Sequence, residues 1–293
     1  MMTSIALFLK LTSFHHVYSD NRYLIDRISN TKRESVKNFA AHFNIEKEKM
    51  ALAESYPDNL RLRHFIRFIF APTCCYQDVY PTSPKIRPTY VAKRLIEIFL
   101  CNLLMVHLAY QHCLPIGNEA MPWFEQWNYT RILISTLHMA IPAAYLWLLM
   151  FYSLFHGYLN LLAELTQFSD RRFYSDWWNA GDLAEYWKKW NQPIHNFIHR
   201  HIYYPMRRRG FSAVQCIYIS FTVSAVFHEL LVFGVFGVVN FISFIVMFVN
   251  APAMIMQGGL LHKGLISKNT NNIAFWLFYI MLAQPFGILF CYY

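Results

Sequence analysis

Charged side chains are scarce in this sequence of 293 residues. Asp, Glu, Lys and Arg make up 15% of the chain, against about 25% in a typical soluble domain. Hydrophobic residues make up 56% and aromatic residues 18%. This composition does not fit a soluble globular domain. It predicts an all-α polytopic membrane protein, in which helices satisfy the backbone hydrogen bonds inside the bilayer.

Cysteine is also sparse and shows no metal-binding spacing. The six cysteines are Cys74, Cys75, Cys101, Cys113, Cys216 and Cys291, and most lie in or beside apolar runs. We therefore predict buried thiols, with no disulfide framework and no metal site. No cleavable signal peptide is visible. The apolar part of segment 1–14 is shorter than the roughly 20 residues of a membrane span, so we interpret it as the remnant of a membrane helix.

Four apolar stretches are long enough to cross a bilayer, which takes about 20 residues per helix. They are 95–115, 132–163, 211–261 and 273–293. The second exceeds one straight crossing, so we expect it to tilt or to break near Pro142. The third can form two crossings with a turn near Asn240.

Lys and Arg are distributed unevenly around these stretches. Of 26 in the chain, 14 lie in segment 15–94, eight in 164–212 and two in 262–272, whereas 116–131 holds one. Because basic residues accumulate on the cytosolic side of membrane proteins, we predict that the three basic segments are cytosolic and 116–131 lumenal. The expected organisation is a helix remnant (1–14), a cytosolic or interfacial segment (15–94), and a membrane core (95–293) that includes loop 164–212 and forms one domain with 15–94.

A His-Glu pair lies in the longest apolar run of the chain, 210–262, between Arg209 and Lys263. Glu229 is the only formal charge in this run, and His228 precedes it in SAVFHELLVFGV. An acidic group at the centre of a membrane helix costs roughly 2.5–3.5 kcal/mol, so its presence indicates function. In a helix, Ser220, Ser224 and His228 share one face, whereas Glu229 is rotated by about 100° and needs a separate partner or a proton. The alternative is a packing histidine bonded to a neighbouring hydroxyl.

Two further segments combine polar and aromatic residues. Segment 173–195, FYSDWWNAGDLAEYWKKWNQPIH, holds seven aromatic residues around Asp and Asn, which also fits an interfacial aromatic belt. In HRHIYYPMRRRG, Arg207–Arg209 precede the apolar run that carries His228. These arginines would stop translocation, anchor lipid, or bind the phosphates of an anionic cosubstrate. These residues predict a buried base that is reached from a basic surface on the cytosolic side. Hydrolysis, acyl transfer and proton-coupled transport are three functions that this pattern leaves open.

The order of these segments resembles one known family. FYSDWWN, followed roughly fifty residues later by an intramembrane His-Glu, resembles the sterol and diacylglycerol branch of the membrane-bound O-acyltransferases. Four segments are more similar to the type 1 acyl-CoA:diacylglycerol acyltransferases than to the sterol enzymes. They are SYPDNL (55–60), FAPTCCYQDVYPTSPKIR (70–87), AELTQFSDRRFYSDWWN (163–179) and HRHIYYPMRRRG (199–210).

This resemblance implies a helical fold that encloses an intramembrane reaction chamber in the endoplasmic reticulum membrane. It implies transfer of a fatty acyl group from acyl-CoA to diacylglycerol, which gives triacylglycerol and CoA. Acyl-CoA would enter from the cytosol as cosubstrate, and the acceptor would enter from the bilayer. We expect no cofactor, no nucleic-acid partner, and a homo-oligomer, either a dimer or a tetramer.

The resemblance also implies residue roles. His228 matches the catalytic base, Asn191 the residue that assists at the acyl carbonyl, and Gln284 a residue near the acceptor hydroxyl. We place Glu229, Ser224 and His195 in the chamber as well, with Ser224 as the orienting partner of His228. The expected acyl-CoA-binding residues are Phe173, Tyr174, Asp176, Trp177, Trp178, Asn179, Arg207, Arg208 and Arg209.

Members of the family begin further upstream and continue beyond QPFGILF. The sequence therefore resembles an N-terminally truncated member. We expect little or no turnover from the 293-residue form by itself, and we expect the addition of the upstream helices to restore it. The alternatives are a sterol acyltransferase with the same base, a non-catalytic paralogue that acts as a membrane partner, and a proton-coupled transporter.

Overall fold

The computed structural model describes residues 2–29, 62–77, 80–237, 239 and 241–293. The predicted all-α fold is confirmed. Within the described residues no strand forms, and the only β-type pairing is an isolated bridge between Thr82 and Phe168. Segment 55–60, one of the four that carry the family resemblance, lies outside the described residues.

Thirteen helices are defined in the described part of the chain. They are α1 (Met2–Ser29), α4 (Leu62–Phe70), α5 (Pro88–Leu108), α6 (Leu114–Glu125), α7 (Tyr129–Phe151), α8 (Leu159–Leu165), α9 (Leu183–Trp190), α10 (Gln192–Ile198), α11 (Tyr204–Arg208), α12 (Ala213–Phe236), α13 (Ile242–His262), α14 (Lys268–Phe278) and α15 (Gln284–Tyr292). Short π-helical turns join α5 to α6, α7 to α8, α10 to α11 and α14 to α15.

Four helical stretches are long and apolar enough to cross a membrane. They are Tyr129–Leu165, Ala213–Gly234, Ile242–His262 and Lys268–Tyr292. Three of the predicted stretches are found among them, and 211–261 forms two crossings. The chain is therefore a multi-pass membrane protein.

Three details differ from the sequence-based expectations. The predicted crossing at 95–115 lies in α5 and the turn after it, which are not among the four; the first half of α5 carries Lys93, Arg94 and Glu97. The helix through Pro142 continues to Phe151 and changes only at a π-helical turn. Helix α1 runs through the boundary placed between segments 1–14 and 15–94.

Local chemistry explains how α12 is bounded. Ser212 and Gln215 form a reciprocal capping box at its first turn, which satisfies backbone N–H groups that have no partner within the helix. Gly237 follows its last residue with a φ of 74°, a conformation that glycine adopts without steric cost. Helix α12 ends at Phe236 and α13 begins at Ile242, so the predicted division into two helices is confirmed, whereas Asn240 itself lies outside the described residues.

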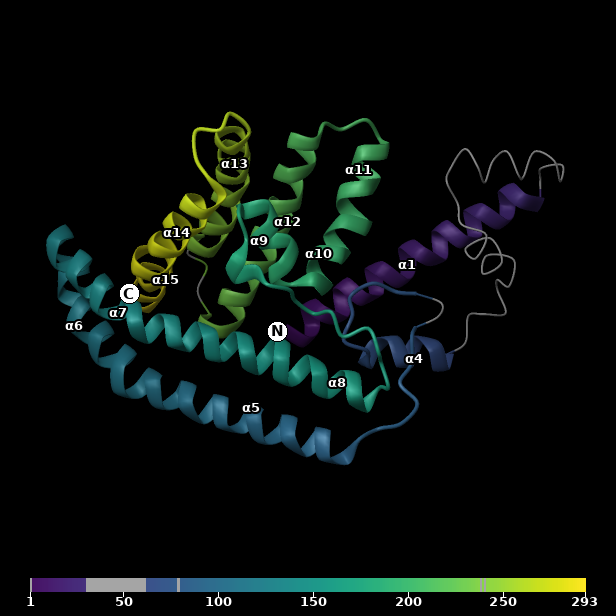
Figure 1. Cartoon of the computed structure of the whole chain (residues 1–293), viewed down its shortest axis with the longest axis horizontal. Coiled ribbons are helices and arrows are strands. Elements are labelled where there is room, and N and C mark those ends of the chain that lie inside the picture. The colour runs from purple at the N-terminus through teal and green to yellow at the C-terminus, as the bar shows by residue number, and fades with distance from the viewer. Residues whose placement is uncertain (1, 30–61, 78–79, 238, 240) are drawn as a thin grey trace.

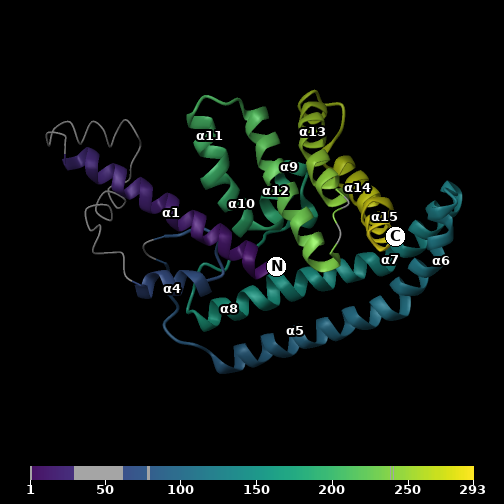
Figure 2. The same ribbon diagram turned by 180° about the vertical axis from the view of Figure 1, so that it is seen from behind.

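Figures 1 and 2 show two groups of helices. Helix α5 runs alongside α7 and α8, and α15 packs on α7. On the other side of α7–α8, α12 and α13 pack against each other, next to α9 and α10. Helix α1 is held to this second group by buried polar contacts. Ser13 Oγ lies 2.7 Å from His201 Nε2 in the turn between α10 and α11.

A cluster of aromatic rings connects the two groups. Trp147 of α7 stacks on Trp190 of α9 with ring centroids 4.9 Å apart and nearly parallel planes. Phe151 and Trp177 pack edge-on against the same cluster. This packing fixes the C-terminal end of α9, and the chain between α9 and α10 therefore has a defined position.

Candidate active site

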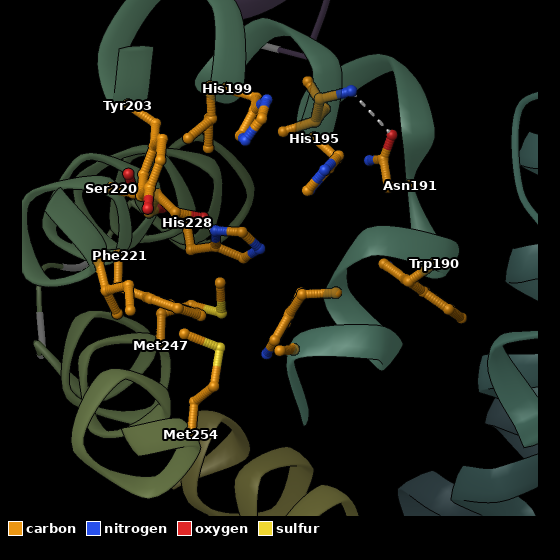
Figure 3. Close-up of a pocket in the computed structure, with 16 residues that line it drawn as sticks. Trp190, Asn191, His195, His199, Tyr203, Ser220, Phe221, His228, Met247 and Met254 are labelled. Atoms are coloured by element: carbon orange, nitrogen blue, oxygen red, sulfur yellow. Dashed lines mark hydrogen bonds between the residues drawn. The ribbon is translucent and has the colours of Figure 1, made fainter. Parts of the chain in front are cut away.

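A cavity of about 260 Å³ lies between α9–α10 and α12–α13. Its walls are mainly apolar. The lining residues are Ala184, Trp187, Trp190, Asn191, Ile194, His195, Ile198, His199, Tyr203, Ile217, Ser220, Phe221, Ser224, His228, Met247 and Met254. Figure 3 shows that the polar side chains converge from opposite walls, with His228 on one side and Asn191 and His195 on the other.

His228 is oriented by its own helix. Its Nδ1 lies 2.8 Å from the backbone carbonyl oxygen of Ser224, one turn earlier in α12. Because a carbonyl oxygen only accepts, Nδ1 must carry the proton and donate it. In the neutral imidazole the lone pair is then on Nε2. The ring projects into the cavity (Figure 3), so its basic nitrogen is presented to a bound molecule.

Asn191 is the single residue between α9 and α10 and caps the start of α10. Its Oδ1 accepts a hydrogen bond from the backbone N–H of Ile194 at 3.3 Å, drawn as a dashed line in Figure 3. This contact assigns the oxygen of the amide, because only an oxygen can accept from that N–H. The Nδ2 group, a pure donor, faces the cavity.

His195 and His199 continue the same wall on successive turns. Their rings stack with centroids 5.5 Å apart. Burial lowers the pKa of His195, and the neighbouring His199 and Lys188 lower it further. Burial and Lys188 likewise lower the pKa of His199. Both imidazoles are therefore neutral at pH 7, and this wall offers hydrogen bonds without fixed charge.

Ser220, Ser224 and His228 all line the cavity, as their spacing predicts. The orienting contact differs from the expected one, however. The backbone carbonyl of Ser224, and not its hydroxyl, accepts from His228. The hydroxyl of Ser220 donates to the carbonyl of Cys216 at 2.7 Å. Serine side chains in helices commonly make this local bond, which satisfies the hydroxyl within one turn.

Glu229 does not line the cavity, contrary to our expectation. The residue is buried, and its two carboxylate oxygens accept from the backbone N–H groups of Phe241 at 2.8 Å and Phe244 at 3.2 Å. These groups belong to the N-terminus of α13. We expected Glu229 to need a partner of its own, and the structure shows that this partner is a helix N-terminus, where the partial positive charge favours a carboxylate.

Gln284 also lies outside the cavity that contains His228. It begins α15, and its Nε2 donates to the carbonyl oxygen of Ala143 in α7 at 2.9 Å. Its Oε1 is buried without a hydrogen-bond partner. The structure therefore places this amide at the contact between α7 and α15, and not beside the predicted base.

The residues expected to bind acyl-CoA divide into two groups, and none of them lines the cavity. Phe173 and Trp177 are buried in aromatic packing, and Tyr174 lies with its hydroxyl 2.8 Å from His156 Nδ1. Trp178, Asn179 and Arg207–Arg209 are exposed and accessible to a ligand.

Asp176 is also exposed, but its carboxylate already has a partner. It forms an ion pair of 2.9 Å with Lys189, and this contact lowers the pKa of its carboxyl. Asp176 therefore links the FYSDWWN segment to α9.

Several wall residues were not predicted from the sequence. Met247 and Met254 of α13 form the apolar wall opposite α9 (Figure 3), and Trp187 and Trp190 face them. The two methionines are seven residues apart, a spacing that keeps them on one helix face. The sequence therefore shows that the two methionines share a helix face, but it does not show which helix that face contacts.

Comparison with known proteins gives a consistent result. The membrane-bound O-acyltransferase family model matches residues 4–292. The chain is 35% identical over 293 residues to a protein named diacylglycerol O-acyltransferase 1C from Glycine max, covering 100% of the chain and 53% of that protein. It is 36% identical over 289 residues to diacylglycerol O-acyltransferase 1 from Homo sapiens, covering 99% of the chain and 56% of that protein. The chain thus spans about half the length of these curated relatives.

Proposed function

The chain belongs to the membrane-bound O-acyltransferase family, and on this basis we propose that it transfers a fatty acyl group from acyl-CoA to the hydroxyl of diacylglycerol. The observation that carries the proposal is the orientation of His228. Its Nδ1–H is held by the Ser224 carbonyl, so the basic Nε2 faces a cavity whose opposite wall presents the amide of Asn191. The names of the relatives support diacylglycerol as the acceptor.

The proposed reaction is a direct transfer. Nε2 of His228 accepts the proton of the acceptor hydroxyl while the hydroxyl oxygen attacks the thioester carbonyl. The carbonyl oxygen becomes an oxyanion and accepts a hydrogen bond from Nδ2 of Asn191, an interaction typically worth about 3 kcal/mol in such sites. The C–S bond then breaks, and the CoA thiolate receives the proton from the His228 imidazolium. Ester and CoA thiol leave, and the base is neutral again.

One feature of the site favours transfer over hydrolysis. The wall formed by Phe221, Met247 and Met254 is apolar, which disfavours water beside the thioester.

We place the protein in the endoplasmic reticulum membrane as a homo-oligomer. Acyl-CoA would reach the cavity from the side of loop 164–212, and the acceptor would arrive from the bilayer. The exposed Trp178, Asn179 and Arg207–Arg209 are the residues available to contact the CoA moiety.

The test supplies purified protein with labelled acyl-CoA and one acceptor at a time: diacylglycerol, cholesterol or water. Because the chain spans about half the length of its relatives, the same assay is run on a fusion with the N-terminal part of one of them. We expect triacylglycerol as the main labelled product. Steryl ester would assign the sterol acceptor instead. Binding of acyl-CoA without any ester product in either form would favour the non-catalytic paralogue.

A further inference from the structure

A second cavity lies away from His228, and its lining is basic. It has a volume of about 440 Å³ and is lined by Ser83, Pro84, Lys85, Arg87, Tyr90 and Arg171. None of these residues lines the cavity that contains His228. The pocket brings together the segment before α5, the first turn of α5, and the chain that follows α8.

Glu164 holds two of the basic side chains in place. This carboxylate has a side chain with 0% exposure and accepts from Arg87 Nε at 3.0 Å and from an amino group of Arg171 at 2.6 Å. The backbone N–H of Arg87 donates to the same carboxylate at 2.7 Å. Because guanidinium groups have five N–H donors, both arginines retain donors beyond these contacts. Glu164 therefore orients the two groups without using all of their hydrogen-bonding capacity.

The pocket has an excess of positive charge. Lys85, Arg87 and Arg171 line it, and Glu164 is paired with the two arginines, so these four side chains carry a net charge of +2. Both guanidinium groups contact the ring of Tyr90, whose centroid lies 4.6 Å from Arg87 Cζ and 5.5 Å from Arg171 Cζ. Aromatic stacking of this kind limits the motion of the arginines and keeps the pocket formed.

The position of the pocket suggests the kind of anion. Glu164 lies one residue before the end of the membrane-spanning stretch Tyr129–Leu165, so the pocket is close to the depth of lipid headgroups. Beyond it, α5 exposes Leu95, Ile96 and Phe99, an apolar surface suited to acyl chains. Basic pockets beside membrane helices are known to bind phosphorylated lipid headgroups.

We propose that this pocket is a binding site for a phosphate group, separate from the catalytic cavity, and that an anionic phospholipid headgroup is its ligand. The N–H donors that Glu164 leaves free on the two guanidinium groups can bind the oxygens of a phosphate, and Lys85 adds a mobile point charge. The phosphates of acyl-CoA have the same chemistry, so the experiment must separate the two sources.

The test titrates the purified protein in detergent with three soluble probes. They are a short-chain phosphatidylinositol phosphate, short-chain phosphatidylcholine of the same chain length, and adenosine 3′,5′-bisphosphate, which carries nucleotide phosphates without an acyl chain. We expect the phosphorylated lipid to bind more tightly than phosphatidylcholine, with an affinity that falls as salt rises.

The informative variant is Lys85→Gln, because Lys85 is exposed and its loss does not leave Glu164 unpaired. It should weaken binding of the phosphorylated lipid about tenfold, as expected for the loss of one charged contact. Arg171→Lys keeps the charge beside Glu164 but removes the guanidinium N–H donors that remain for the ligand, and should also weaken binding. Lys263→Gln is the matched control, since it removes the same charge at the exposed end of α13.

The outcomes distinguish the sources. Lys85-dependent binding of the phosphorylated lipid supports the proposal, and Lys85-dependent binding of adenosine 3′,5′-bisphosphate alone would reassign the phosphate site to acyl-CoA. Equal affinity for the phosphorylated lipid and phosphatidylcholine would overturn it, as would an unchanged affinity in Lys85→Gln. The readout is binding, so the result does not depend on whether the protein transfers acyl groups.

Discussion

The orientation of His228 leads to a prediction that separates two neighbouring residues of α12. Replacing His228 with Ala removes the proposed base. Replacing Ser224 with Ala removes a hydroxyl from the cavity wall but keeps the backbone carbonyl that holds Nδ1. If the carbonyl is the orienting group, only the first substitution should abolish acyl transfer.

The magnitudes follow from the contacts. General base catalysis typically contributes 10²- to 10⁴-fold, or roughly 3–5 kcal/mol of transition-state stabilisation, so His228→Ala should lower kcat by about that factor. The folded state should lose little. His228 gives up one hydrogen bond worth about 1 kcal/mol, and Ala is the better helix former. Ser224→Ala should change kcat by less than about threefold, because no charge and no base is lost.

The assay measures acyl-CoA binding, triacylglycerol formation and thermal unfolding on the same purified samples. In His228→Ala, binding and the unfolding midpoint should stay near the wild-type values while product formation falls. Wild-type turnover by His228→Ala would refute the proposed base. A loss in Ser224→Ala as large as that in His228→Ala would show that the hydroxyl, and not the carbonyl, orients the imidazole.

Four further outcomes can be measured with the same preparations. Glu229→Gln should destabilise the protein by about 1–3 kcal/mol, because the NH₂ group of the new Gln cannot accept from the α13 N–H groups. This loss would appear as a lower unfolding midpoint, and kcat per folded molecule should be unchanged. Asn191→Ala should lower kcat about 10²-fold with little change in acyl-CoA affinity, and it should also cost about 1 kcal/mol of stability through the lost α10 cap. Burial lowers the pKa of His201 to about 4 from its usual 6.5, so its contribution to stability is present above pH 6.5 and is lost as the pH falls from 6.5 towards 4; a His201→Gln variant should show a flatter acid-side unfolding curve. Simultaneous replacement of Arg207–Arg209 with Gln should raise the KM for acyl-CoA and weaken its salt dependence, whereas misinsertion with unchanged KM would assign these arginines to topology.

The sequence determined the features that depend on local composition and period. Apolar runs of sufficient length predicted the helices Ala213–Gly234 and Ile242–His262 and the turn between them, because span length is set by the thickness of the bilayer. The helical period placed Ser220, Ser224 and His228 on one face, and all three line the cavity. A buried carboxylate required a partner wherever it lay in the fold, so the need of Glu229 for one was predictable.

Tertiary packing decided which group met each of these requirements. The N-terminus of α13 supplies the donors for Glu229, and Gln284 of α15 donates to a carbonyl oxygen of α7. Asn191 reaches the cavity of His228 because stacked tryptophans fix the end of α9. Phe173 belongs to the FYSDWWN segment that resembles the family, yet its side chain lies in the hydrophobic core and not in the cavity. Hydrophobicity and periodicity identify the face of a helix but not its neighbour. A polar group can be satisfied equally well by any donor or acceptor that packing brings within about 3 Å, so only the folded chain selects the partner.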